Sequence, residues 1–187
     1  MTLHLTDVLG LLWGGSELGL TLAKRSKSDA TSKDRHSLGL IWLVCLAAVA
    51  VGIDAAYRLP QCALPRPETA RALGCGLFVL GMALRWYSII HLGRFFTTNV
   101  AIAKDHYVVD TGPYRFMRHP SYTGSMMAVL GFLLTIANWA MLLIVFVPVL
   151  AVTLWRIHIE EAALLAALGG PYRAYLQRTK RLIPGVY

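Results

Sequence analysis

The chain has 187 residues, of which 56% are hydrophobic and only 15% are charged, with a formal net charge of +8. A typical globular chain has about 25% charged residues, so this composition argues against an ordinary soluble domain. The basic residues fall in loops between apolar runs, which orientation in a membrane explains better than nucleic-acid binding. No polar linker divides the chain, so residues 1–187 are predicted to form one integral-membrane domain.

A membrane-spanning helix needs about 20 mostly apolar residues. Three such stretches come first along the chain, at residues 6–23, 38–56 and 71–92. Between the first two lies a polar, basic loop at residues 24–36, and between the second and third a proline-rich turn. The third span carries Arg85 at depth, and a charge there is usually paired or functional. Arg85 therefore either pairs with Asp54 or Glu17 or contacts a ligand.

A stretch of 35 residues from Ser121 to Trp155 contains no Asp, Glu, Lys, Arg or His. As one helix it would reach ~50 Å, well beyond a hydrocarbon core of ~30 Å. It is therefore predicted to fold as two antiparallel helices that turn at Asn138-Trp139. The result is an all-α, polytopic bundle of about five transmembrane helices. An amphipathic segment, broken near Gly169-Gly170-Pro171, follows the last span.

The connections at residues 24–36 and 93–119 and the C-terminal tail are all basic. With five spans they lie on one side of the membrane, and the bias of Lys and Arg places that side in the cytoplasm. Within the second connection, His106–Val109 reads as a short β-like run. Gly74, Gly76 and Gly81 fall in an apolar helix and are predicted to mark close helix packing.

The densest cluster of chemically active side chains is Gly112–Gly124, which reads GPYRFMRHPSYTG. Pro113 and Pro120 lack a backbone N–H, and each biases its predecessor away from the α region. Pro120 suits the first turn of a helix, so Arg118 and His119 come to a helix N-terminus, which favours anionic groups. The alternative is a belt of Tyr and Arg at the membrane interface.

A second cluster holds Arg156, Glu160 and Glu161 and lies where a hydrophobic span leaves the membrane. Arg156 and Glu160 are four residues apart, so they share one helix face. They form either a simple ion pair or part of a site on the same side of the membrane as the first cluster. No Gly-rich phosphate loop is present, and neither the histidines nor the three cysteines show a metal-binding spacing.

These clusters resemble the isoprenylcysteine carboxyl methyltransferase family, whose members are integral-membrane enzymes that use S-adenosylmethionine (SAM). The resemblance covers roughly residues 81–187. It rests on the segments Gly112-Pro113-Tyr114, Arg118-His119-Pro120-Ser121-Tyr122, His106–Val109, Leu154-Trp155-Arg156 with Glu160-Glu161, and Leu182-Ile183-Pro184, on Arg85, and on their order along the chain.

The resemblance implies a SAM pocket on the cytoplasmic face. Its cofactor-binding residues are expected to be His106, Tyr107, Val108, Val109, Tyr114, His119, Pro120, Ser121, Tyr122 and Glu160. Arg156 is expected to bind the methyl-accepting group and, with Glu160, to serve catalysis. Asn99 matches a family position that is expected to make a further polar contact with the cofactor.

The implied activity is methyl transfer to a lipophilic acceptor that arrives through the bilayer, with isoprenylcysteine-type carboxyl methylation as the leading reaction. A carboxylate has an ordinary pKa near 4 and is already ionised at neutral pH, so no general base is required. Another amphiphile, such as a phospholipid amine, phenolic lipid or small thiol, is the enzymatic alternative. A small membrane transporter or scaffold is the alternative outside enzymes.

Overall fold

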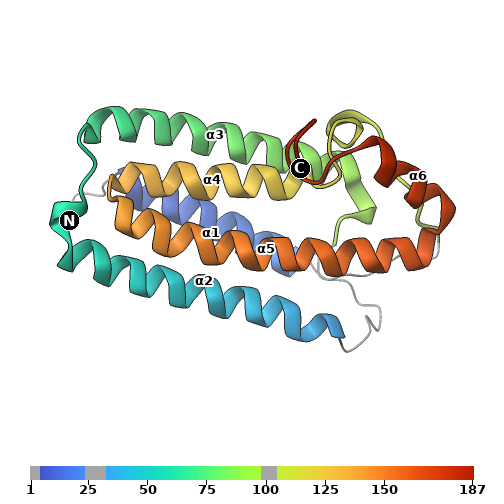
Figure 1. The fold of residues 1–187 in the computed structure, drawn as a ribbon, viewed down its shortest axis with the longest axis horizontal. Coiled ribbons are helices and arrows are strands. Elements are labelled where there is room, and N and C mark those ends of the chain that lie inside the picture. The colour runs from blue at the N-terminus through green and yellow to red at the C-terminus, as the bar shows by residue number, and fades with distance from the viewer. Residues whose placement is uncertain (1–4, 24–32, 98–104) are drawn as a thin grey trace.

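The computed structural model describes residues 5–23, 33–97 and 105–187, and Figure 1 shows their arrangement. Five long helices run roughly parallel to one axis, and a short sixth helix lies across one end. Their bounds are α1 Leu5–Ala23, α2 Lys33–Arg58, α3 Pro67–Leu92, α4 Pro120–Ile136, α5 Trp139–Leu168 and α6 Gly170–Arg178. The predicted all-α bundle of five long helices is confirmed.

Helices α2, α3 and α5 are each long and apolar enough to cross a membrane, and α4 is a shorter apolar helix. Many large apolar side chains on these helices point outward, among them Leu46, Leu80 and Val147. In water such a surface would be an aggregation liability, whereas in a bilayer it contacts lipid tails. The outer surface therefore fits a polytopic membrane bundle.

The predicted hairpin turn is confirmed at Asn138. Helix α4 ends at Ile136, and Ala137 has a left-handed backbone (φ 57°) that reverses the chain. The Asn138 side chain then accepts a hydrogen bond from the Met141 backbone N–H at 3.0 Å and caps α5. Its amide also donates to the Leu59 carbonyl at 3.2 Å, which ties the hairpin to the end of α2.

Helices α3 and α4 make the closest contact in the bundle. A Cβ atom added to Gly81 would lie 2.6 Å from the carbonyl oxygen of Gly124, and one added to Gly74 would lie 2.6 Å from that of Gly131. Small residues permit this approach of two backbones. The predicted packing role is thus confirmed for Gly74 and Gly81. It is wrong for Gly76, where an added Cβ would meet no atom of another described segment within 4 Å.

Three sequence-based predictions are corrected by the structure. Helix α2 begins at Lys33, inside the predicted loop, and α5 continues without a break to Leu168. Residues 106–109 form no strand, because no neighbouring segment pairs with their backbone in the described part of the chain. The break between α5 and α6 at Gly169 is confirmed, with a positive φ of 58°.

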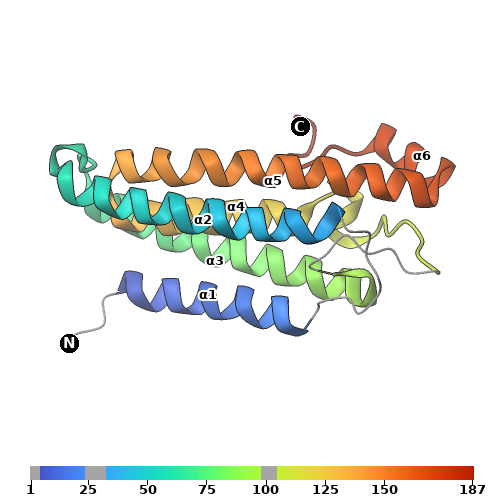
Figure 2. The same ribbon diagram turned by 90° about the horizontal axis from the view of Figure 1, so that it is seen from below.

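The end of α1, the start of α2, the segment 105–119, helix α6 and the C-terminal tail lie together at one end of the bundle (Figures 1 and 2). The opposite end holds the 59–66 connection and the α4–α5 turn. This arrangement brings the two chemical clusters found in the sequence to the same end.

Candidate functional site

A cavity of about 310 Å³ opens between the helices at the end that carries α6. All six helices contribute to its wall. Its polar part is lined by His106, Tyr107, Tyr114, His119, Tyr122, Arg156, Glu160 and Tyr172. Its apolar part, deeper in the bundle, is lined by Trp13, Ile41, Trp42, Cys45, Met126, Val129 and Val149. The cavity is therefore amphiphilic along its length.

The residues predicted from the sequence to form the site line this cavity, with one exception. The lining includes His106, Tyr107, Val108, Val109, Tyr114, His119, Ser121, Tyr122, Arg156 and Glu160. Pro120 is absent from the lining because its ring is fully buried at the first turn of α4, where its fixed φ starts the helix. Asn99 lies outside the described residues.

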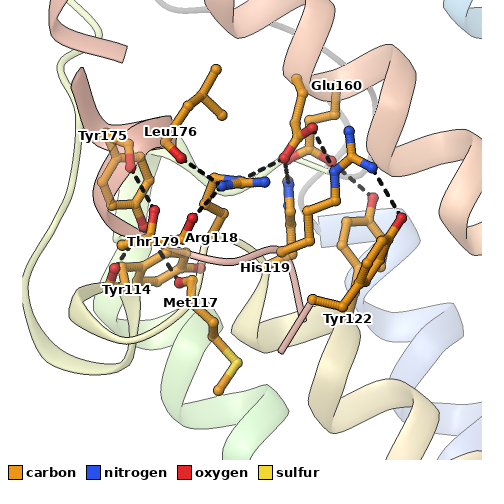
Figure 3. A network of polar contacts seen from close by, with 12 residues as sticks. Tyr114, Met117, Arg118, His119, Tyr122, Glu160, Tyr175, Leu176 and Thr179 are labelled. Carbon is orange, nitrogen blue, oxygen red and sulfur yellow. Dashed lines mark hydrogen bonds and ion pairs between the residues drawn. The ribbon is translucent and has the colours of Figure 1, made fainter. Parts of the chain in front are cut away.

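Tyr122 links the two predicted clusters. Its hydroxyl donates to Glu160 Oε2 at 3.0 Å and also shares a side-chain hydrogen bond with Arg156, which is 3% exposed. Figure 3 shows Tyr122 and Glu160 facing each other across the site. Arg156 and Glu160, one turn apart on α5, therefore converge on a single hydroxyl at the cavity wall. Their role is not that of an isolated surface ion pair.

The neighbouring Glu161 has a different role, which the sequence did not reveal. It is 7% exposed and accepts hydrogen bonds from Arg118 Nε at 2.7 Å and Arg181 Nε at 2.9 Å. The His119 ring nitrogen Nε2 lies 3.3 Å from the same carboxylate. These partners come from two segments of the chain, the one before α4 and the C-terminal tail. Glu161 thus holds His119 and Arg118 in position while Glu160 faces the cavity.

The C-terminal tail fastens the segment that carries His119. The backbone N–H groups of Arg118 and His119 donate to the carbonyls of Lys180 and Arg181, at 2.8 and 3.0 Å. The Arg118 guanidinium also donates to the carbonyls of Leu176 and Thr179 (Figure 3). These bonds engage Nη1 of Arg118, whose Nε binds Glu161, although the side chain also touches the cavity. They hold the backbone of Arg118 and His119 against the C-terminal tail directly before Pro120.

Two buried tyrosines support the cavity wall next to this segment. The Tyr175 hydroxyl donates to the Tyr114 carbonyl at 2.6 Å, and the Tyr114 hydroxyl donates to the Ser88 carbonyl at 3.3 Å. Burial raises the pKa of Tyr114 and that of Tyr175 well above the ordinary value. Both phenols are therefore neutral hydrogen-bond donors and fixed parts of the wall.

His106 packs its ring against Phe95, with ring centroids 4.5 Å apart. Desolvation lowers the pKa of His106 below its ordinary value, while the carboxylates of Asp105 and Glu160 act in the opposite direction. The imidazole is therefore neutral at pH 7. Its Nδ1 atom is buried and has no hydrogen-bond partner among the described residues, which suits a site where a ligand completes the bonding.

Arg85 pairs with Glu17, which decides between the partners that the sequence allowed. Arg85 Nη2 lies 2.6 Å from Glu17 Oε2. Asp54 instead pairs with Arg58, at 2.8 Å near the far end of α2. Both members of the Glu17–Arg85 pair line the cavity.

Comparison with known proteins points to one family. The family model for isoprenylcysteine carboxyl methyltransferase (ICMT) matches residues 72–166. That match runs from α3 to the last turns of α5. It contains the segment from His106 to Tyr122 and both Arg156 and Glu160.

Individual relatives agree with the family match. The chain is 33% identical over 116 residues to the protein-S-isoprenylcysteine O-methyltransferase of Schizosaccharomyces pombe. The aligned region covers 58% of this chain and 47% of that protein. The chain is 34% identical over 115 residues to protein-S-isoprenylcysteine O-methyltransferase B of Arabidopsis thaliana, covering 60% and 58%. The chain thus spans about half the length of the curated relatives it matches.

A solved structure shares the fold. The eukaryotic intramembrane Ras methyltransferase ICMT superposes with a TM-score of 0.69 at 23% identity. The match covers 97% of this chain and 65% of that one. Helices α1 and α2, which precede the family match, therefore belong to the shared architecture as well.

Proposed function

Because the chain belongs to the isoprenylcysteine carboxyl methyltransferase family, we propose that it transfers a methyl group from SAM to the carboxylate of an isoprenylcysteine-type acceptor in the membrane. One observation carries this proposal beyond family membership. A single cavity joins a polar part, lined by Tyr122, Arg156 and Glu160, to an apolar part deep among α1, α2, α4 and α5. An acceptor with a charged head and a long apolar chain matches that division.

The polar part fits the chemistry of SAM, which supplies an electrophilic methyl group on a sulfonium centre. Glu160 offers a carboxylate for an ammonium group, and Tyr122 fixes that carboxylate through its hydroxyl. The unpartnered Nδ1 of His106 offers one further hydrogen bond. The rest of the SAM molecule would be enclosed by Tyr107, Val108, Val109, Tyr114, His119 and Ser121.

Arg156 would bind the carboxylate of the acceptor. A guanidinium presents planar, paired donors that match a carboxylate, and Arg156 is buried where the polar and apolar parts meet. An ionised carboxylate is nucleophilic without losing a proton. The residues therefore need only hold the acceptor in line and exclude water.

The apolar part would hold the isoprenoid chain. Trp42 of α2 lines the cavity and is 38% exposed. An accessible aromatic side chain at this wall supports entry of the acceptor from the bilayer. Thioether and alkyl groups gain about 25 cal/mol for each Å² removed from water.

Substitutions on one face of α5 test this assignment. Glu160→Gln is expected to weaken SAM binding, because the charged partner of an ammonium group is lost. Arg156→Lys is expected to spare SAM binding and to lower turnover, because an ammonium cannot reproduce the guanidinium fork. Calorimetric titration with S-adenosylhomocysteine and methylation of S-farnesyl-3-thiopropionic acid measure the two effects separately.

The matched control is Glu68→Gln, which alters only an exposed ion pair with Arg71 on α3. It should match the parent in both assays. If Glu160→Gln and Arg156→Lys also bind S-adenosylhomocysteine and turn over the acceptor like the parent, the assignment of this helix face is wrong.

The polar end of the cavity is proposed to face the cytoplasm. Helix α6 and the C-terminal tail lie at that end, and they carry Arg173, Arg178, Lys180 and Arg181. Basic residues mark the cytoplasmic side of membrane proteins. Cysteines introduced at positions 178 and 64 should react with impermeant reagents from opposite sides, position 178 from the cytoplasm. Labelling of position 178 from outside would reverse the topology.

A further inference from the structure

We infer that Thr123 is a positioning residue, whose hydrogen bond to the C-terminal tail (residues 179–187) sets the affinity of the site for its cofactor. Thr123 and the tail residues 180–182 are described by the structure but do not line the cavity. They therefore act through neighbouring residues that do. The inference rests on the proposed function, because the site in question is the SAM site of that function.

Three consecutive carbonyl groups of the tail accept hydrogen bonds from the start of α4. The backbone N–H groups of Arg118 and His119 donate to the first two. The third carbonyl, that of Leu182, accepts from the Thr123 hydroxyl at 2.8 Å. Two adjacent backbone groups and one side chain thus bind one continuous stretch of the tail.

The Thr123 hydroxyl has one proton and three neighbouring acceptors. The Leu182 carbonyl oxygen lies at 2.8 Å, whereas the His119 carbonyl oxygen and the Met117 sulfur each lie at 3.3 Å. Hydroxyl donors are most often found at about 2.7–2.8 Å from an oxygen acceptor. The proton therefore goes to the tail rather than to the carbonyl four residues earlier, which is a common partner of threonine within helices.

The tail bonds lie on both sides of the stretch of α4 that faces the cavity. Ser121 and Tyr122 line the cavity. The bonded N–H of His119 comes just before this stretch, the bonded hydroxyl of Thr123 comes just after it, and Pro120 has no N–H to contribute. Because both ends of the stretch are tied to the tail, its position depends on where the tail lies.

Side chains hold the tail at this place. Arg181 Nε donates to Glu161 Oε2 at 2.9 Å, and Arg181 Nη1 donates to the Tyr187 hydroxyl at 2.9 Å. The Leu182 side chain is buried. The tail is thus anchored by its backbone, an ion pair and a buried leucine, and it offers Thr123 a fixed acceptor.

Cofactor binding and docking of the tail are consequently linked. A ligand that contacts His119 and Tyr122 binds best to the conformation in which the tail holds both residues in place. The linkage is reciprocal, so a bound ligand stabilises the docked tail as much as the docked tail raises the affinity. The net contribution of one hydrogen bond corresponds to about a fivefold change in an equilibrium constant.

Thr123→Val tests the inference, because valine has the shape of threonine without its hydroxyl. The dissociation constant for S-adenosylhomocysteine should rise about three- to fivefold. KM for SAM should rise in parallel, while KM for S-farnesyl-3-thiopropionic acid should stay that of the parent. Thr123→Ser keeps the hydroxyl and should return both cofactor values to those of the parent.

Thr135→Val is the matched control on the same helix. The Thr135 hydroxyl donates to the Phe132 carbonyl at 2.6 Å and lies near the other end of α4. The substitution also removes one buried threonine hydroxyl, and it should leave S-adenosylhomocysteine binding unchanged whatever it does to stability. A merely structural role for Thr123 predicts the same unchanged binding for Thr123→Val.

Hydrogen exchange of the detergent-solubilised protein reads the linkage without turnover. Saturating S-adenosylhomocysteine should slow the exchange of tail amides at residues 182–187, which lie outside the cavity lining. Thr123→Val should lose most of this slowing, and Thr123→Ser should keep it. The connection at residues 59–66, at the opposite end of the bundle, is the reference, and its exchange should not respond.

Equal dissociation constants for the parent and Thr123→Val would overturn the inference and leave the proposed activity in place. Tail amides of the parent that do not respond to S-adenosylhomocysteine would do the same, and this measurement decides even if Thr123→Val fails to fold. If no acceptor is methylated but the binding and exchange patterns appear, the proposed methyl transfer fails and the positioning role stands. A parent that binds no S-adenosylhomocysteine would overturn both.

Discussion

Two carboxylates at this end of the bundle, the buried Glu161 and the partly buried Glu17, both bind arginine yet differ in how completely they are bonded. Glu161 receives hydrogen bonds from Arg118 and Arg181 and lies 3.3 Å from the His119 ring. Among the described residues, Glu17 has a single charged partner, Arg85, and one of its oxygens has no hydrogen-bond partner. One carboxylate is fully bonded by these residues, and the other is not.

This difference separates positioning from recognition. A buried charge stabilises a fold only when the geometry is good and further hydrogen bonds satisfy the remaining atoms. Glu161 meets that condition and fastens α5, the C-terminal tail and the segment before α4 to one another. Glu17 meets it only in part, because one of its oxygens has no partner among the described residues.

The largest effect is expected from Glu161→Leu. Removing this carboxylate leaves Arg118 without its charged partner while Arg118 is only 11% exposed. Breaking a buried ion pair by removing one partner costs about 3–5 kcal/mol of unfolding free energy. Denaturation of detergent-solubilised protein measures the loss, which should be accompanied by weaker S-adenosylhomocysteine binding as His119 loses its support.

Glu68→Leu is the control for that variant, because it removes an exposed partner of Arg71. Exposed ion pairs contribute at most about 1 kcal/mol. Equal stability of Glu161→Leu and this control would remove the structural role assigned to Glu161.

A smaller effect is expected when the Glu17–Arg85 pair is divided. Glu17→Leu leaves a lone charge on Arg85 and should cost about 3 kcal/mol, toward the lower limit because Glu17 is 21% exposed. The double variant Glu17→Leu/Arg85→Met should regain most of that loss, because replacing a whole buried pair is often neutral. Unfolding of the parent, both single variants and the double variant gives the coupling energy. A double variant as unstable as the sum of the single variants would show that the two side chains are not coupled, which would contradict the assigned ion pair.

The smallest effect concerns the backbone that carries Arg85. A Cβ on Gly124 would lie 2.5 Å from the Arg85 backbone nitrogen. Gly124→Ala should therefore push α3 from α4 and cost about 1–3 kcal/mol. Gly76→Ala, where no atom lies within 4 Å, should be neutral or stabilise the helix by up to about 1 kcal/mol. Similar unfolding curves for the two variants would refute the close packing at Gly124.

Much of the fold could be predicted because its signals are local. A run of uncharged residues too long for one helix required a hairpin, and the structure turns at Asn138 as expected. Apolar length located the five helices, and Pro120 marked the start of α4. The end of α5 could not be read in this way, because its last turns are amphipathic and pack on α6 rather than on lipid.

The candidate site was predictable to the extent that its residues are close in sequence. His106 to Tyr122 and the pair Arg156 and Glu160 were identified from spacing and family resemblance, and they line one cavity. The sequence places Glu161 in the second cluster but predicts no role for it. Consecutive helical residues differ by about 100° around the axis, so only the packing of α5 decides which glutamate faces the cavity and which faces Arg118.

The sequence by itself determined that this protein is a bundle of apolar helices with its basic connections and reactive side chains gathered at one end. Helix length, charge and proline placement depend on neighbouring residues, so they are fixed before the chain folds. The tertiary structure alone decided the partner of Arg85, the fastening of His119 by the C-terminal tail, and the amphiphilic cavity. Each of these depends on contacts between residues far apart in the chain, whose distances only the packing of the helices sets.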